Sequence, residues 1–300
     1  MGKHKSSRDG GSTDLTGNLC ELLRVGADGA EEQGERRVDL ASLDPDATPG
    51  FDGGKKAGKK ALAALSEEIT ELQARLMAHG YTGGHRRILV ILQGMDTAGK
   101  GGAVKHAVGL LDPGGLRLKS FRKPTEEELG HDFLWRIRKE LPAAGQIGIF
   151  DRSHYEDVLV ARVHQLAPAE EIERRYGAIN TFEQRLVDAG TTILKCMLHI
   201  SAEEQRDRLV ARLDDPTKVW KFRPEDVDER GHWPDYQAAY ETALERCGRA
   251  APWYVIPANH KWYRSLALAS LLRTALAEMN LSWPSPGFDV EEQRARLLAG

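Results

Sequence analysis

The sequence Ile88-Leu-Val-Ile-Leu-Gln-Gly-Met-Asp-Thr-Ala-Gly-Lys-Gly-Gly102 holds a short apolar run followed at once by a glycine-rich segment. Residues 88–92 are all apolar, as in a strand that is buried between two helical layers. The next residues match the pattern GxxxxGK, and residues 103–111 continue with a helical pattern. A strand, a glycine-rich loop and a helix in this order predict a phosphate-binding loop at the centre of a sheet.

The glycine-rich segment has the chemistry that a chain of phosphates requires. Glycines let the backbone curl so that successive N–H groups point inward, and the following helix adds the positive end of its dipole. Lys100 supplies an ammonium group for phosphate oxygens. The alternative is a glycine-rich turn without a ligand, which the lysine and the strand–helix context disfavour. Phosphate contacts are predicted for the loop residues Gly94, Met95, Thr97, Ala98, Gly99, Lys100, Gly101 and Gly102.

One position departs from the usual phosphate loop and points to a metal ion. The Ser or Thr that normally follows the lysine and binds magnesium is replaced by Gly101. Asp96, inside the loop, is the candidate substitute. A carboxylate among phosphate-binding amides would repel the substrate unless a cation lay between them. We therefore expect Asp96 to help hold a divalent metal, which is magnesium with manganese as the alternative.

A second candidate acid follows another apolar run. Residues 147–150 form a β-type run that places Asp151 at its carboxyl end, where open α/β sheets bind ligands. An Asp at this position is often only a helix cap, but beside a phosphate loop it predicts a second metal-organising residue. Arg152 is predicted to face phosphate. His154 fits packing or capping as well as catalysis, because phosphoryl transfer needs positioning and charge more than a strong base.

The remaining β-type runs alternate with helical stretches, which implies parallel strands joined by crossover helices. Together with residues 88–92 and 147–150, the runs lie at 116–121, 191–200 and 254–256. More than fifty residues separate the last two runs, which is much more than one crossover helix needs. The pattern predicts a three-layer α/β/α fold with a five-stranded, mainly parallel sheet and an inserted helical lid at about 201–247.

Basic residues gather in this predicted lid. Arg208 and Arg212 are four residues apart, so they share one face of a helix, and Lys218 and Lys221 follow around Trp220. A run of charges is ordinarily a solvated face, and acidic residues are interleaved here. Next to a phosphate loop, however, a basic flap that closes over phosphates is the better interpretation.

Composition and charge exclude several classes of protein. Hydrophobic residues make up 41% and charged residues 29% of the 300 residues, which is ordinary for a globular enzyme. A net charge of −3 argues against a general nucleic-acid-binding protein. The three cysteines form no CxxC or Cys/His cluster, so neither a disulfide framework nor a zinc site is expected. No signal peptide or membrane-spanning run is visible, and a cytoplasmic location is predicted.

The chain divides into predicted segments of different character. Residues 1–18 are rich in Gly, Ser, Lys and Asp and predict a disordered tail. Residues 19–56 contain turn signals and predict an N-terminal arm that docks on the core. Residues 57–285 are the expected catalytic domain, which begins with an amphipathic helix ending near Gly80. Residues 286–300 predict a C-terminal helix.

Several further motifs accompany the loop in a fixed order. After the 94–102 loop these are Pro124-Thr125-Glu126-Glu127-Glu128, Phe133-Leu134-Trp135-Arg136, Phe150-Asp151-Arg152-Ser153-His154-Tyr155-Glu156-Asp157, Trp220-Lys221-Phe222 and Trp262-Tyr263. Together they resemble one known family, the family-2 polyphosphate kinases. The resemblance covers roughly residues 21–280, and glycine after the loop lysine is normal in that family.

The resemblance implies a P-loop kinase fold similar to that of thymidylate kinase, magnesium dependence, and phosphoryl transfer between polyphosphate and a nucleoside mono- or diphosphate. It implies that Asp96 and Asp151 organise the metal and that Lys100 and Arg152 bind phosphate. Arg208, Arg212, Lys218 and Lys221 would then be the lid cations. The resemblance further implies a homo-oligomer, a dimer or a tetramer. The net charge and the shortness of the apolar runs predict no nucleic-acid or membrane partner.

Two other functions use the same elements. An ATP-dependent nucleotide kinase shares the fold and the loop, and it would need ATP rather than polyphosphate as the phosphoryl donor. A P-loop switch or a non-catalytic polyphosphate-binding module would bind without turnover. The sequence contains no NKxD guanine-reading motif and no LSGGQ-like segment, and the catalytic-type residues are intact, which disfavours this second alternative.

Overall fold

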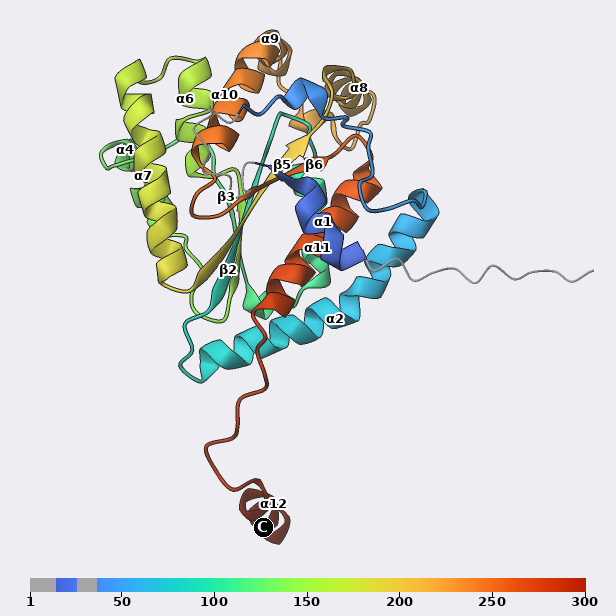
Figure 1. The fold of residues 1–300 in the computed structure, drawn as a ribbon, viewed down its shortest axis with the longest axis vertical. Coiled ribbons are helices and arrows are strands. Elements are labelled where there is room, and N and C mark those ends of the chain that lie inside the picture. Colours follow the sequence, from blue (N-terminus) through green and yellow to red (C-terminus); the bar gives the residue numbers. More distant parts are fainter. Residues whose placement is uncertain (1–14, 26–36) are drawn as a thin grey trace, which may run out of the picture.

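The computed structural model of the chain describes residues 15–25 and 37–300. For residues 15–18 it describes the backbone alone. In the described residues a central sheet lies between two layers of helices (Figure 1). The strands are β1 (Arg24–Val25), β2 (Arg87–Gly94), β3 (Leu116–Ser120), β4 (Ile147–Asp151), β5 (Thr191–His199) and β6 (Trp253–Pro257). Their order in the sheet is β1-β6-β5-β2-β4-β3, and all neighbours are parallel except β1 and β6.

The helices follow the strands in regular alternation. One layer contains α1, α2, α3 and α11, which pack on one another, and the other contains α6, α7 and α10 (Figure 1). In chain order the α-helices are α1 (Leu15–Leu23), α2 (Lys55–Tyr81), α3 (Lys100–His106), α4 (Glu126–Leu129), α5 (Trp135–Arg138), α6 (Val160–Val163), α7 (Ala169–Asp188), α8 (Ala202–Leu213), α9 (Glu225–Gly231), α10 (Trp233–Arg246), α11 (Lys261–Glu278) and α12 (Val290–Ala299). Short 3-10 turns are η1 (Leu40–Ser42), η2 (Val108–Leu110), η3 (Pro113–Gly115), η4 (His154–Asp157) and η5 (Val219–Lys221).

The predicted α/β fold is confirmed, but the predicted number of strands is wrong. All five predicted runs are strands, and the apolar run at 88–92 lies within β2, between β4 and β5. The described part of the chain has a sixth strand, β1, which is only two residues long and antiparallel to β6. Two residues are too few to show the alternation that identifies a strand in a sequence. β1 pairs with β6 where α1 packs against α11, so its position depends on tertiary contacts.

The lid predicted at 201–247 contains α8, η5, α9 and α10, and these elements lie beyond the carboxyl ends of the strands (Figure 1). It is more than a projecting helical hairpin, because α10 buries Ala239, Tyr240, Ala243 and Leu244 against the core. The segment between α8 and α9 is the exposed part, with the Trp220 side chain 74% exposed. The lid therefore has a base that is integral to the domain and a tip that faces solvent.

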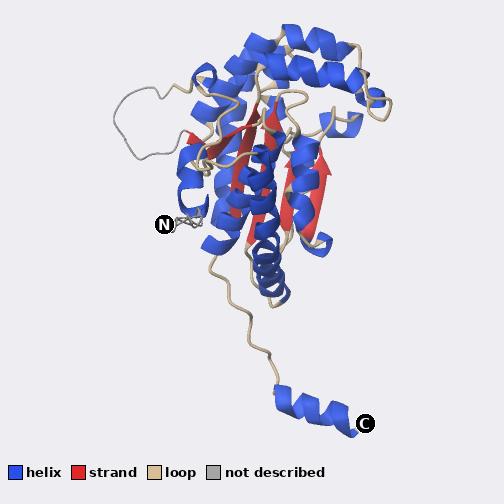
Figure 2. Cartoon of the chain, turned by 90° about the vertical axis from the view of Figure 1, so that its right-hand side faces the viewer, coloured by secondary structure: helices blue, strands red, loops and turns tan. Residues whose placement is uncertain are grey.

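The segments at the two ends of the chain are described in part. α1 begins at Leu15, so residues 15–18 of the predicted tail are helical, while residues 1–14 of that tail lie outside the described residues. In the segment predicted to be an N-terminal arm, Pro49 O accepts from the Tyr263 hydroxyl at 2.8 Å, and Leu43 O lies 3.1 Å from His199 Nε2. Figure 2 shows α12, the predicted C-terminal helix, at the end of an extended segment apart from the sheet. In the described ranges, no helix combines the length and the apolar character needed to cross a bilayer.

A buried ionic network joins α7 and β5 to η4, the turn that follows Asp151 at the end of β4. The Lys195 ammonium, fully buried on β5, donates to Glu183 Oε2 at 2.6 Å and also bonds Cys247 O. Glu183 Oε1 accepts from the Tyr155 hydroxyl at 2.8 Å and lies 3.3 Å from His154 Nε2. This network favours the packing interpretation of His154, because the ring is fully buried and faces Glu183.

Replacing Glu183 with glutamine should lower the free energy of unfolding by about 3–5 kcal/mol, because the Lys195 charge would remain buried without its partner. Burial raises the pKa of Glu183, but Lys195 and then His154 outweigh it, so its pKa lies below the usual value. A carboxylate with a lowered pKa stabilises the fold above its unfolded pKa and loses this contribution as the pH falls. Wild-type stability should therefore decline below about pH 4.3, and the variant's decline should be shallower. Urea unfolding at several pH values measures both effects.

The matched control is Glu170→Gln, at an exposed position of the same helix. It should change the free energy of unfolding by less than about 0.5 kcal/mol. Equal stability of the two variants at pH 7 would contradict the assigned role of the buried pair.

Candidate active site

One cleft at the carboxyl edge of the sheet brings together the residues that the sequence singled out. β2 and β4 run parallel in register, with Leu92 opposite Asp151, so the loop after β2 and the end of β4 are neighbours. The cleft is lined by Asp96, Thr97, Gly99, Lys100, Gly101, Gly102, Asp151, Arg152, Arg208, Arg212, Lys218 and Lys221, together with Ala211 and Lys261. Both predicted acids and all predicted cations therefore border the same space.

The glycine-rich loop has the tight backbone that its sequence predicts. Gly99 has φ +100° and precedes the first residue of α3, and Thr97 has φ +64°, a left-handed conformation that is uncommon outside glycine. Arg152, directly after β4, has φ +66°. Left-handed residues of this kind concentrate at ligand sites, where the surrounding structure holds them in place. Two separate backbone turns are thus fixed on either side of the cleft.

Lys100 is held by the loop itself. Its ammonium donates to Gly94 O at 2.7 Å and to Met95 O at 3.3 Å, and its side chain is buried. Burial and then the nearby Arg152 lower the pKa of Lys100, while Asp96 and Asp151 act in the opposite direction. An ammonium destabilised by burial and by a neighbouring cation gains from an anionic ligand. The local electrostatics therefore favour phosphate beside Lys100.

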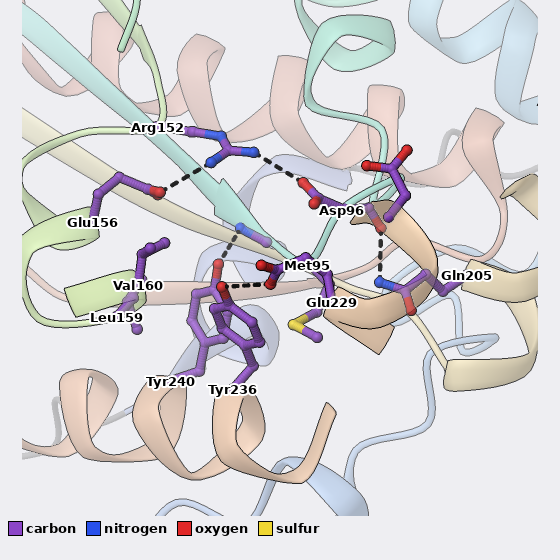
Figure 3. A pocket seen from close by; sticks show the side chains of 12 residues that line it. Met95, Asp96, Arg152, Glu156, Leu159, Val160, Gln205, Glu229, Tyr236 and Tyr240 are labelled. Atoms are coloured by element: carbon purple, nitrogen blue, oxygen red, sulfur yellow. Dashed lines mark hydrogen bonds and ion pairs between the residues drawn. The ribbon is translucent and has the colours of Figure 1, made fainter. Parts of the chain in front are cut away.

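Asp96 is tied to Arg152 across the cleft (Figure 3). Arg152 Nη2 donates to Asp96 Oδ1 at 2.9 Å, and Nη1 donates to Glu156 Oε2 at 3.1 Å. Glu156 raises the pKa of Arg152 most, burial opposes it, and Asp96 adds to the increase. The guanidinium is therefore permanently charged and aimed at the carboxylate that the sequence assigned to metal.

The two acids suit a magnesium site that the substrate completes. Asp151 Oδ2 accepts only a long hydrogen bond, 3.4 Å from Ser120 Oγ, and Asp151 lines the cleft with Asp96. In the described ranges no group of three or more His, Cys, Asp or Glu side chains could enclose a metal. Magnesium at phosphoryl-transfer sites is usually bound through one or two carboxylates, with phosphates and water as the other ligands. The donor set fits that mode.

Two of the four predicted lid cations, Lys218 and Lys221, lie on the exposed tip of the lid, and Arg212, near the end of α8, contacts that tip. Arg212 Nη1 is 3.2 Å from Lys221 O and 3.4 Å from Asp226 Oδ2, and the Lys221 ammonium lies 5.0 Å from the centre of the Trp220 ring. Lys218 pairs with Asp215 in the same turn. Contacts within the lid therefore hold these three side chains at the border of the cleft.

Arg208 differs from the other lid cations because its guanidinium is buried and bonded on all sides. Nη1 donates to Thr97 O at 2.9 Å and to Ala98 O at 3.0 Å, and Nη2 donates to Ala258 O at 2.6 Å. Nε donates to Glu204 Oε1 at 2.6 Å. Arg208 therefore braces the back of the phosphate loop from α8, and its predicted contact with phosphate stays a prediction.

Other residues complete the site and have no local signal in the sequence. The Tyr240 hydroxyl accepts from Gly94 N at 3.0 Å, and Gln205 Nε2 donates to Asp96 O at 3.2 Å (Figure 3). Beside this cleft a second hollow is lined by Asp96, Asp151 and Arg152 and also by Arg122 and Lys123. These contacts join segments that are far apart in the chain, so residue spacing could not predict them.

A side chain at Gly99 should disturb the loop. A Cβ on Gly99 would lie 2.0 Å from Arg264 Nη1, and φ +100° disfavours any L residue with a side chain. Gly99→Ala should lower kcat/KM about 100-fold, the cost of a misplacement of roughly 1 Å. Steady-state kinetics measures this. The control Gly109→Ala, where the nearest atom is 4.0 Å away, should retain activity; equal losses would contradict the assignment.

Comparison with known proteins agrees with this geometry. A family profile described as Polyphosphate kinase 2 matches residues 53–283. The AMP/ADP-polyphosphate phosphotransferase of Meiothermus ruber is 46% identical over 85% of this chain and 94% of its own length. The ADP-polyphosphate phosphotransferase of Rhodopseudomonas palustris is 37% identical over 84% of this chain and 90% of its own. The crystal structure of Polyphosphate Kinase 2 from Arthrobacter aurescens TC1 superimposes with a TM-score of 0.89 and 52% identity, covering 94% of this chain and 97% of that one.

Proposed function

The chain belongs to the Polyphosphate kinase 2 family, and we propose on that basis that it transfers the terminal phosphoryl group of inorganic polyphosphate to AMP and ADP. The printed names of its relatives supply the substrates. The observation that carries the proposal for this chain is the single cleft in which Asp96 and Asp151 lie among Lys100, Arg152 and the lid cations. Such a cleft suits two polyanions that must approach each other.

The transfer proceeds in line. A terminal oxygen of the nucleotide attacks the end phosphorus of polyphosphate, and the bond from that phosphorus to its bridging oxygen breaks. The bridging oxygen remains on the shortened chain, so no covalent enzyme intermediate forms. Lys100 and Arg152 stabilise the negative charge on the transferred group, and the loop amides orient it. Arg212, Lys218 and Lys221 hold the rest of the polyphosphate chain.

Asp96 and Asp151 are the acids that would bind the metal. Asp96 and Asp151 would hold magnesium, or manganese in its place, which when bound offsets charge on the phosphates. Arg152 orients Asp96 through their 2.9 Å contact and is positioned in turn by Glu156. We further propose that the fold is of the thymidylate-kinase type and that the chain forms a dimer or a tetramer in the cytoplasm. The family relationship supports the fold type, the oligomer and the location.

An assay matrix tests the proposal. AMP, ADP, GMP and GDP are each incubated with magnesium and long-chain polyphosphate in the absence of ATP, and the products are identified by chromatography. ADP and ATP should form from AMP and ADP. Phosphorylation that requires ATP would instead identify an ATP-dependent nucleotide kinase, and polyphosphate binding without any product would identify a binding module.

A further inference from the structure

Arg264 is a buried arginine behind the phosphate loop. It lies in the first turn of α11, it is 3% exposed, and it lies against the loop at Gly99 and Gly102 without lining the cleft. A Cβ on Gly99 would lie 2.0 Å from its Nη1, and a Cβ on Gly102 would lie 3.0 Å from its Nη2. A side chain at Gly99 would clash with this guanidinium, and one at Gly102 would crowd it. The guanidinium group therefore lies close against the loop at these two residues.

No acid neutralises this arginine in the described ranges. Among the described residues, its only side-chain hydrogen bond runs from Nη2 to the adjacent Ser265 Oγ at 3.3 Å, and Nε has no partner there. Arg273, on the same helix, shows the usual arrangement, because it pairs with Glu68 at 2.6 Å. A buried charge without a partner is costly, so proteins rarely keep one unless something else compensates it.

The surroundings of Arg264 add positive charge rather than remove it. Arg208 lies beside it, since a Cβ on Gly99 would be 3.7 Å from Arg208 Nη1. Burial and then Arg208 lower the pKa of Arg264 to about 10. Burial and then Arg208 also lower the pKa of Lys261, which lines the cleft. Arg264, Arg208 and Lys261 are thus neighbouring cations, and within the described ranges Arg208 alone of the three forms a salt bridge with an acid, Glu204.

We propose that Arg264 is a positioning residue for phosphate binding: its unpaired guanidinium supplies positive charge through the loop backbone and is compensated only when polyphosphate occupies the cleft. This inference rests on the proposed function. Loop amides and Lys100 contact the phosphates, while Arg264 acts on them from behind Gly99 and Gly102 without touching them. The same contact keeps the two glycines in the conformation that points their amides forward.

The proposal predicts opposite effects on the free and the bound protein. Without ligand, the uncompensated charge destabilises the fold, so Arg264→Met should leave the thermal midpoint unchanged or raise it. With polyphosphate, the variant lacks one favourable charge, so its KM for polyphosphate should rise about tenfold, with a smaller change in kcat. The increase in thermal midpoint on adding polyphosphate should shrink accordingly.

The experiment compares wild type, Arg264→Met, Arg264→Lys and Arg273→Met in full-length protein, by thermal unfolding with and without long-chain polyphosphate and by steady-state kinetics. Arg264→Lys keeps the charge and should recover most of the lost affinity even if its packing is imperfect. Arg273→Met removes a paired arginine of the same helix and should leave KM unchanged.

Three outcomes would overturn the inference. The first is an unchanged KM for polyphosphate in Arg264→Met, and the second is an equal rise of this KM in Arg264→Lys and Arg264→Met. The third is a lower thermal midpoint of Arg264→Met together with an intact response to polyphosphate; this last result would indicate a purely structural role. Failure of the proposed function would look different, because wild type would then show neither turnover nor stabilisation by polyphosphate.

Discussion

Replacing Lys100 with methionine is expected to lower polyphosphate-driven ATP formation from ADP by about 1,000-fold while the fold is retained. The ammonium is the one side-chain cation built into the phosphate loop, and removing a preorganised donor at a site of developing charge typically costs about 100- to 1,000-fold. Because Lys100 carries a full charge in a buried position, we expect the upper end of that range. The initial rate of ATP formation with saturating ADP and polyphosphate measures the loss.

Stability separates this effect from unfolding. Among the described residues, Lys100 donates only to the backbone oxygens of Gly94 and Met95, and burial lowers its pKa. The charge of Lys100 therefore does not stabilise the fold of the ligand-free protein. Methionine fills a similar volume without the desolvation cost, and the thermal midpoint should not fall. Lys105→Met, on the exposed side of the same helix, should retain full activity. Substantial ATP formation by the Lys100 variant would reject the site.

Replacing Asp96 with asparagine should have a comparably large effect, about 1,000-fold, because it removes a carboxylate that we propose binds the metal. Asparagine keeps the shape of the side chain and can still accept a hydrogen bond from Arg152, which now lies 2.9 Å from Asp96 Oδ1. The amide lacks the charge that a divalent ion requires. Activity should therefore remain low, and the magnesium concentration for half-maximal rate should increase.

Magnesium titrations of wild type, Asp96→Asn and Asp151→Asn measure this prediction. Asp151→Asn should behave in the same way, because Asp151 borders the same cleft. The control Asp188→Asn changes an exposed aspartate at the end of α7 and should have no effect on the titration. A wild-type response to magnesium in both cleft variants would exclude these aspartates as metal ligands.

The centre of the fold was predictable because its signals are local. Five apolar runs, separated by helical stretches, identified five strands of the sheet, and the glycine spacing of residues 94–102 identified the loop. The special backbone at Gly99 is encoded at that residue, since φ +100° strongly favours glycine. The location of Asp151 was predictable for a similar reason, because open α/β sheets bind ligands at the carboxyl ends of their parallel strands.

Other assignments needed the fold. Arg208 and Arg212 are four residues apart, which is the spacing of two cations on one face of a helix. In the structure, however, Arg208 is buried and donates to Thr97 O and Ala98 O, whereas Arg212 donates to Lys221 O within the lid. A helical period gives the face that a residue shares, but not which neighbour covers that face. The two-residue strand β1 was missed for the related reason that its only support is the strand it pairs with.

By itself the sequence determined the strand–loop–helix unit, the alternation of the layers and the family, because each depends on residue types at fixed short spacings. The tertiary structure alone decided that Tyr240 closes the loop at Gly94 N, that Arg208 braces it, and that Arg264 lies behind it without an acid. Those contacts join residues more than a hundred positions apart, at separations of 146 for Tyr240 and 111 for Arg208. No periodicity extends over such distances; only the packing of whole layers brings those side chains together.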